Sequence, residues 1–386
     1  MDVIPSGFDF EPRTRLVFGP GILAGTGEIV RELGATRALV VSDPGVVKAG
    51  HAAAALESLE RSGLEALLYD GVVENPTDAC AVLGAEAARG IRAEVIVGVG
   101  GGSAMDCAKG IAVLLARGGP LERWRGVGKI GRGLLPLVLA PTTAGTGSEV
   151  QSSALLSREA TGEKMLLWDR ALAPRTAILD PQATLTAPRG ASAAAGVDAV
   201  AHAVESFVSA RATALSRMFS REAFRLLLGA FETALQDPGN LPARSDMLLG
   251  ASLAGLAIEN SMLGAAHSCA NPLTHRMGIP HGVAVGLMLP HVVRFNGGDP
   301  GVEERYAELL AAAGILPDPE GAAETLARRL EGLLHAAGLP MDLRALDVEE
   351  DSLAALAEEA GAQWTASFNP RPVGPGTLLE VYRWAL

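Results

Sequence analysis

The sequence predicts an α/β N-terminal domain with a parallel sheet, followed by an all-α C-terminal domain. In residues 1–187, short apolar and β-branched runs bounded by Gly, Pro or Asp alternate with amphipathic stretches of helical length, which is typical of βαβ units. From residue 188 onward, Ala-, Leu- and Glu-rich helical periodicity dominates. We therefore expect two domains, residues 1–187 and residues 188–386.

The individual elements follow from the same patterns. The run Val95-Ile96-Val97 is continuously apolar, as in a parallel strand that is covered on both faces. The expected strands are 14–19, 37–43, 65–70, 94–99, 134–140 and 176–180, with helices at 24–33, 53–62 and 79–89. The expected C-terminal helices are 191–210, 216–235, 245–263, 303–313, 322–336 and 351–360.

Composition excludes several classes of protein. With 48% hydrophobic residues the chain is not disordered, and its net charge of −12 argues against binding to nucleic acid or to an anionic membrane. Cys80, Cys107 and Cys269 form no CxxC pair, so we expect a reducing compartment. Without signal-peptide features near the N-terminus, the expected location is the cytoplasm.

A glycine-rich turn follows the expected strand at 94–99. Gly100, Gly101 and Gly102 precede Ser103 at the start of a helix. Glycines allow the backbone to approach a phosphate, and a helix N-terminus favours the anion. A capping box between Ser103 and Asp106 is the structural alternative, but it does not explain three glycines. The turn is therefore a candidate phosphate-binding site.

A second polar loop follows the expected strand at 134–140. It contains Thr142, Thr143, Thr146 and Ser148 among small residues, at the strand end where open α/β sheets bind ligands. Asp43 ends another strand. Its carboxylate could bind a ribose diol and repel a 2′-phosphate, or it could cap a helix.

Histidines are concentrated in the C-terminal half. Asp198 and His202 are four residues apart in an expected helix, so both project from one face. His267 and His281 are 14 residues apart in the sequence, which suits two helices joined by a bend. One carboxylate and three imidazoles suit Fe²⁺, Zn²⁺ or Mn²⁺. We therefore predict a metal site.

Together, four ordered motifs resemble the iron-containing (group III) alcohol dehydrogenase family, which is related in fold to dehydroquinate synthase. The resemblance extends from Phe18 to about Asn296. The motifs are Gly100-Gly101-Gly102-Ser103 with Asp106 and Lys109, Pro141-Thr142-Thr143-Ala144-Gly145-Thr146-Gly147-Ser148-Glu149, Gly196-Val197-Asp198-Ala199-Val200-Ala201-His202-Ala203-Val204-Glu205, and Pro280-His281-Gly282.

The resemblance implies that the N-terminal domain binds a nicotinamide dinucleotide and that the C-terminal domain binds a metal and the substrate. NAD(H) is expected in preference to NADP(H), because Asp43 would meet the adenosine ribose. The remaining implied cofactor contacts are Asn75, Gly101, Gly102, Ser103, Asp106, Thr142, Thr143, Thr146, Ser148, Lys164 and Leu179.

For the C-terminal domain, the resemblance implies one divalent metal, with Fe²⁺ ahead of Zn²⁺, bound by Asp198, His202, His267 and His281. The implied activity interconverts a small alcohol and its aldehyde or ketone by hydride transfer, and we expect a homodimer. Two alternatives within the fold stay open: an NAD-using, metal-dependent cyclase or lyase of the dehydroquinate synthase type, and an enzyme similar to maleylacetate reductase.

One position departs from the family pattern. Family members usually carry another histidine four residues after the metal ligand that corresponds to His267. This chain has Asn271 at that position. An asparagine cannot titrate. His275 is one helical turn further along and could replace the missing histidine if the helix continues past Pro272. Asn271 and His275 are therefore the candidate catalytic positions.

Overall fold

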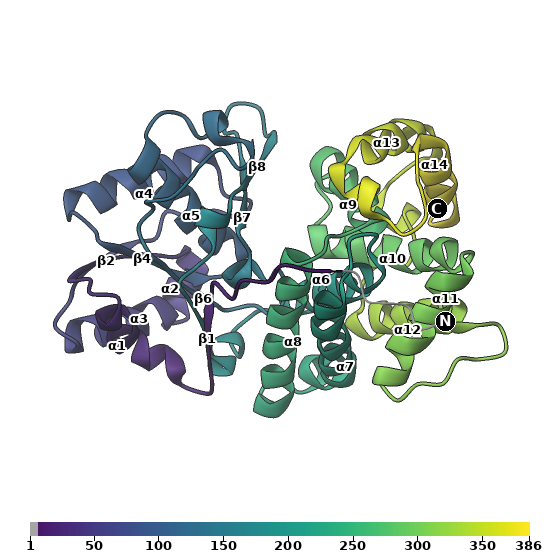
Figure 1. Cartoon of the computed structure of the whole chain (residues 1–386), viewed down its shortest axis with the longest axis horizontal. Helices are drawn as coiled ribbons and strands as arrows, with labels where there is room; N and C mark the ends of the chain where they lie inside the picture. Colours follow the sequence, from purple (N-terminus) through teal and green to yellow (C-terminus); the bar gives the residue numbers. More distant parts are fainter. Residues whose placement is uncertain (1–6) are drawn as a thin grey trace. The chain divides into compact units, whose positions relative to one another are not determined.

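The computed structural model describes residues 7–386, which form two compact units (Figure 1). Glu11–Ala187 forms the α/β unit, and Pro188–Leu386 forms most of the helical unit. Residues 7–10 belong to the helical unit rather than to the α/β unit, because the ring of Phe10 packs against Phe219, with 6.1 Å between ring centroids. This differs from the expected N-terminal range, which began at residue 1.

The α/β unit is built on a six-stranded parallel sheet. Its strand order is β1-β9-β6-β4-β2-β3, and all six expected strands belong to it. The predicted fold class is confirmed. The strands are β1 (Arg15–Phe18), β2 (Arg37–Val41), β3 (Glu65–Tyr69), β4 (Val95–Gly100), β6 (Leu137–Pro141) and β9 (Thr176–Leu179).

Helices cover both faces of this sheet, because alternate strand residues point to opposite sides. Leu39 and Val41 of β2 belong to the core cluster that includes side chains of α4 (Asp78–Gly90) and α5 (Gly102–Arg117). Ala38 and Val40 belong to the opposite cluster, with α1 (Thr26–Glu32) and α3 (His51–Arg61). In Figure 1 these two helix pairs flank the sheet.

A second, three-stranded sheet was not predicted. It has the order β5-β8-β7, and β7 and β8 are antiparallel. Only every second residue of β7 and β8 is buried, so these strands lack the continuous apolar runs that reveal the main sheet. The segments not predicted in this unit are β5 (Gly126–Val127), β7 (Ser153–Ser157), β8 (Lys164–Trp168) and the short helix α2 (Pro44–Lys48).

The helical unit is arranged around α6. This helix packs against α7, α8 and α10 and is buried almost continuously after its second turn. No helix in residues 7–386 is long and apolar enough to cross a membrane. The helices are α6 (Arg189–Val208), α7 (Ala214–Gln236), α8 (Leu241–Glu259), α9 (Ala265–Met277), α10 (His281–Gly297), α11 (Pro300–Ala312), α12 (Ala322–Ala337), α13 (Glu350–Ala362) and α14 (Pro375–Trp384).

A buried polar network fixes the threonine-rich loop onto α5. The ammonium of Lys109 is fully buried and donates to the carbonyls of Ser148 and Ser153, both at 2.7 Å, and to Ser148 Oγ at 2.8 Å. Asp106 accepts from Ser148 Oγ at 2.6 Å and from the Leu155 amide at 2.8 Å. Asp106 and Lys109 are themselves 4.0 Å apart. The loop after β6 is therefore attached to α5 by a compensated pair of charges.

We expect Lys109→Met to lower the free energy of unfolding by about 3–5 kcal/mol, because it leaves Asp106 without its buried counter-charge. Chemical denaturation followed by circular dichroism measures this change. Lys129→Met, at an exposed lysine, is the control and should change stability little. Equal effects of the two substitutions would contradict the assigned role of the network.

Candidate metal and cofactor sites

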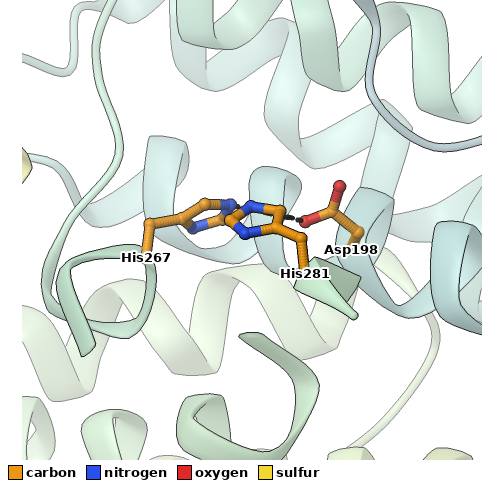
Figure 2. A group of neighbouring side chains, drawn as sticks. All are labelled: Asp198, His267 and His281. Atoms are coloured by element: carbon orange, nitrogen blue, oxygen red, sulfur yellow. Dashed lines mark ion pairs between the residues drawn. The ribbon is translucent and has the colours of Figure 1, made fainter. Parts of the chain in front are cut away.

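Four predicted metal ligands converge in the helical unit. Asp198 and His202 lie one turn apart on α6, His267 lies in the first turn of α9, and His281 is the first residue of α10. Asp198 Oδ1 lies 3.4 Å from His202 Nε2, 3.4 Å from His267 Nε2 and 3.9 Å from His281 Nε2. Figure 2 shows His267 and His281 directed toward this carboxylate. Three separate helical segments thus bring their donors to one point.

The cluster has the chemistry of a metal site. The ligand atoms of Asp198, His267 and His281 all lie within 4.8 Å of one another. Asp198 Oδ1 and His267 Nε2 are buried and have no hydrogen-bond partner among residues 7–386, and buried polar atoms are normally paired. Two donors bound to one ion at about 2.1 Å in tetrahedral geometry are about 3.4 Å apart. The donor set therefore fits a divalent transition metal.

His202 completes the cluster from the side of α6. Its ring stacks on that of His267, with 4.9 Å between centroids and 20° between planes. Asp198, His202 and His267 are all buried, whereas the His281 side chain is about one-third exposed. Solvent can therefore reach the cluster from the side of His281.

The charged groups of the cluster shift one another's pKa values toward the ionised forms. Burial alone would raise the pKa of Asp198, but the neighbouring His202, followed by His267 and His281, lowers it well below its usual range. Burial opposes protonation of His267, but the carboxylates of Glu205 and Asp198 raise its pKa to about 9. A metal ion would take the place of that positive charge, and the ligand imidazoles must be neutral to bind it.

Glycines set the approach of α10 to α6. A Cβ atom on Gly282 would lie 2.2 Å from the Ala194 carbonyl oxygen, and one on Gly286 would lie 2.3 Å from Val197 Cγ1. Neither position accepts a side chain without displacing one of the two helices. His281, next to Gly282, is therefore placed against Asp198 by direct backbone packing.

In the α/β unit, the glycine-rich turn and the threonine-rich loop face each other. A Cβ atom on Gly101 would lie 3.4 Å from Thr143 Oγ1, and one on Gly102 would lie 2.8 Å from Thr146 Cγ2. Gly101 is the N-cap of α5 and provides no side-chain cap. The 16-residue helix therefore directs its N-terminus at this turn, as in anion-binding sites.

The polar residues of these motifs divide into two groups. Thr143, Thr146 and Ser103 retain exposed surface at the turn. Thr142 is buried, and its amide donates to the Gly100 carbonyl at 3.0 Å. Ser148 and Asp106 belong to the Lys109 network. The capping box considered between Ser103 and Asp106 does not form, because Asp106 bonds to Ser148 and Leu155 instead.

Asp43 lies beside the same turn. Its Oδ1 caps α2 by accepting from the amides of Gly45 and Val46 at 2.9 and 3.1 Å. Its Oδ2 would lie 3.3 Å from a Cβ atom on Gly100. The structure thus places Asp43 both as a helix cap and next to the glycine-rich turn.

The remaining cofactor candidates are spread over neighbouring elements. Asn75 is exposed with a left-handed backbone, φ +53°, and lies two residues before Thr77, which bridges to Ser157 of β7. Ser157 in turn pairs with Lys164 of β8, so Asn75 and Lys164 lie near the same end of the β7–β8 pair. Leu179, at the end of β9, is fully buried.

The structure does not bring His275 to the metal cluster. Helix α9 continues through Pro272, so the helical phase from His267 is kept. However, His275 is eight residues from His267, which corresponds to about 12 Å along the axis. It is exposed in the last turn, where Arg276 and His275 lower the pKa of Glu359. Asn271 lies between the two histidines and donates to Gln363 Oε1 at 3.1 Å.

Sequence reasoning did not single out Glu205 as a site residue. It follows Asp198 by seven positions on α6, and its carboxylate oxygen lies 2.5 Å from His267 Nδ1. The spacing of Asp198, His202 and Glu205 at i, i+4 and i+7 places all three on one helix face. That periodicity was the available signal.

Both units match models of one protein family. Residues 12–181 match the model described as iron-containing alcohol dehydrogenase, and residues 192–386 match the C-terminal model of the same family. This chain belongs to the iron-containing alcohol dehydrogenase family. It is therefore an enzyme that interconverts alcohols and aldehydes or ketones, and the family uses NAD(H) and a divalent metal that is typically iron. The match supports the oxidoreductase activity that was expected from the sequence.

Individual relatives agree with this assignment. The chain is 34% identical over 384 residues to a 1,3-propanediol dehydrogenase from Citrobacter freundii, covering 98% of both chains. A crystal structure of a 1,3-propanediol oxidoreductase superposes with a TM-score of 0.94 at 33% identity, covering 99% of this chain and all of the other. A sulfoacetaldehyde reductase from Bifidobacterium kashiwanohense, solved with NAD⁺, gives 0.91 at 27% identity, covering 98% and 99%.

Because His275 is exposed and far from the cluster, we expect His275→Gln to leave two properties of this iron-containing alcohol dehydrogenase unchanged: the pH dependence of kcat and the metal content. Steady-state kinetics between pH 5 and 9 and metal analysis measure these quantities. A limb near the ordinary imidazole pKa of about 6.5 that disappears in the variant would instead assign His275 to proton transfer.

Proposed function

We propose that this alcohol dehydrogenase binds one divalent metal, iron in preference to zinc, through Asp198, His202, His267 and His281. The observation that carries this proposal is the convergence of three imidazole nitrogens on the buried oxygen Asp198 Oδ1. When bound, the metal supplies Lewis acidity at the alcohol oxygen, and the nicotinamide supplies the hydride acceptor.

The side chains of the cluster have different proposed roles in charge compensation, water access and substrate entry. Asp198 provides the negative charge, and the buried His202 and His267 limit the access of water to it. His281, which is partly exposed, lies where a small alcohol could enter. With Asn271 bonded to Gln363, no titrating side chain stands at the position where the family usually has a histidine. We therefore propose that release of the alcohol proton requires no titrating side chain at position 271.

For the cofactor, we propose that the pyrophosphate binds at the N-terminus of α5. Gly101, Gly102 and Ser103 would approach it through their backbone, and Thr143 and Thr146 would donate from the opposite loop. Asp106 and Ser148 would act indirectly, by fixing this loop through Lys109. Asn75 and Lys164, near the same end of the β7–β8 pair, are proposed for the adenosine and ribose side.

The proposed substrates are short alcohols and diols, because the chain is similar to 1,3-propanediol dehydrogenases over its whole length. The cytoplasm is the proposed compartment, which the three buried, free cysteines favour. The expected homodimer stays a prediction that light scattering can test.

The metal assignment is tested by anaerobic purification followed by metal analysis and an alcohol and aldehyde activity panel. We expect one divalent ion per chain in the wild type, and loss of both the ion and activity in His281→Ala, because the substitution removes one of four donors. Binding of NADH should persist, since its proposed site lies in the other unit. His335→Ala, at an exposed histidine of α12, is the control. Full activity after complete chelation would refute the assignment.

Cofactor preference is tested at Asp43, which we propose discriminates against NADP(H). Asp43→Asn keeps an oxygen that can cap α2 but removes the charge that would repel a 2′-phosphate. We expect the ratio of kcat/KM for NADP⁺ to that for NAD⁺ to rise about tenfold, or about 1.4 kcal/mol.

The chain contains a matched control for this substitution. Asp299 precedes the same Pro-Gly-Val sequence and caps α11 by accepting from Gly301 and Val302 at 2.9 and 3.1 Å. Asp299→Asn should therefore cause a similar change in stability and none in cofactor preference. An unchanged ratio in Asp43→Asn would show that Asp43 is only a helix cap.

A further inference from the structure

Glu205 is a buried carboxylate with two defined contacts beside the metal cluster. One oxygen, Oε2, lies 2.5 Å from His267 Nδ1, and the other, Oε1, accepts from the Ala266 amide at 2.7 Å. Its side chain is only 4% exposed. Because a carboxylate can only accept, Nδ1 of His267 must be the protonated nitrogen in this contact.

The start of α9 depends on acceptors from outside the helix. Its N-cap, Gly264, has no side chain, and a Cβ atom there would lie 2.9 Å from Asn369 Oδ1 and 3.1 Å from Glu205 Oε1. Glu205 accepts from Ala266, and Asn369 Oδ1 accepts from Ala265 at 3.2 Å. These bonds satisfy helix amides that would otherwise need a capping side chain.

We propose that Glu205 is a positioning residue of the metal centre: it fixes the Nδ1–H tautomer and the ring orientation of His267, so that the Nε2 lone pair faces the ion. This inference rests on the metal site proposed above. A neutral imidazole has one N–H and one lone pair, so donation from Nδ1 leaves Nε2 free to bind. The buried Nε2 of His267, 3.4 Å from Asp198 Oδ1, lacks a hydrogen-bond partner among the described residues.

The substitution Glu205→Gln separates this role from helix capping. A glutamine side chain has one acceptor and one donor end. If its oxygen accepts from Ala266 and preserves the cap, its amide group faces His267 Nδ1 and favours a lone pair there. The ring proton then moves to Nε2 and blocks the metal-binding nitrogen. The change is nearly isosteric, so any loss of binding reports on hydrogen-bond polarity.

The experiment measures the dissociation constants of Zn²⁺ and Co²⁺ at one fixed pH by competition with a chelator, together with the visible spectrum of the Co²⁺ form. For Glu205→Gln we expect binding about 10–100-fold weaker than in wild type and an altered Co²⁺ spectrum. Asn369→Ala is the matched control. It removes the bond to the Ala265 amide, together with two bonds to Asn296 and one to the Arg371 carbonyl, and leaves both contacts of Glu205 in place. Its metal affinity should therefore stay close to that of wild type.

Glu205→Asp provides a second test should the glutamine variant not fold. It keeps the charge, but the shorter side chain cannot reach both Ala266 and His267, so affinity should again fall. Wild-type affinity in Glu205→Gln or Glu205→Asp overturns the inference, as does an equal loss in Asn369→Ala. Failure of the wild-type protein itself to bind either ion would instead refute the metal site proposed above.

Discussion

The carboxylate of Asp198 imposes the main constraint on the helical unit. A buried charge is costly unless opposite charge or hydrogen bonds compensate it. Here the compensation comes from imidazoles on α6, α9 and α10, so the position of one oxygen depends on how three helices pack. The burial of α6 comes from its packing against α7, α8 and α10, and of these three helices only α10 carries a partner of Asp198.

The α/β unit also contains buried charge, which is compensated within the pair formed by Lys109 and Asp106. Lys109 is fully buried under the threonine-rich loop, and together with Asp106 it bonds to Ser148, Ser153 and Leu155. These bonds attach the loop to α5 without any ligand. Preorganisation of this kind lowers the entropic cost of binding, which suits a turn whose own glycines offer only backbone groups.

Much of this could be predicted from the sequence, because the strongest signals were local. Apolar runs such as Val95-Ile96-Val97 gave the six main strands, and the i, i+4 spacing of Asp198 and His202 predicted two donors on one helix face. The smaller sheet escaped prediction because β7 and β8 are short and half-exposed. Their alternating burial is a weaker signal than a continuous run.

Other features depended on distance in space rather than on pattern. His275 kept the helical phase of His267 through Pro272, but phase alone does not show how far a residue lies along the axis. The contact of Glu205 with His267 joins residues 62 positions apart, and the support of α9 by Asn369 spans 104 positions. The i, i+7 spacing places Glu205 on the same face of α6 as Asp198, but it does not show which distant helix end the carboxylate will meet.

The glycines between α6 and α10 also restrict how this enzyme can evolve. Because a Cβ atom on Gly282 or Gly286 would collide with α6, the spacing of the helices that carry Asp198 and His281 cannot be adjusted by small steps of substitution. Changes in substrate range must therefore arise at positions that leave this helix pair intact. A mutagenesis library that fixes both glycines and varies exposed positions near His281 would retain more folded members than one spread evenly over α10.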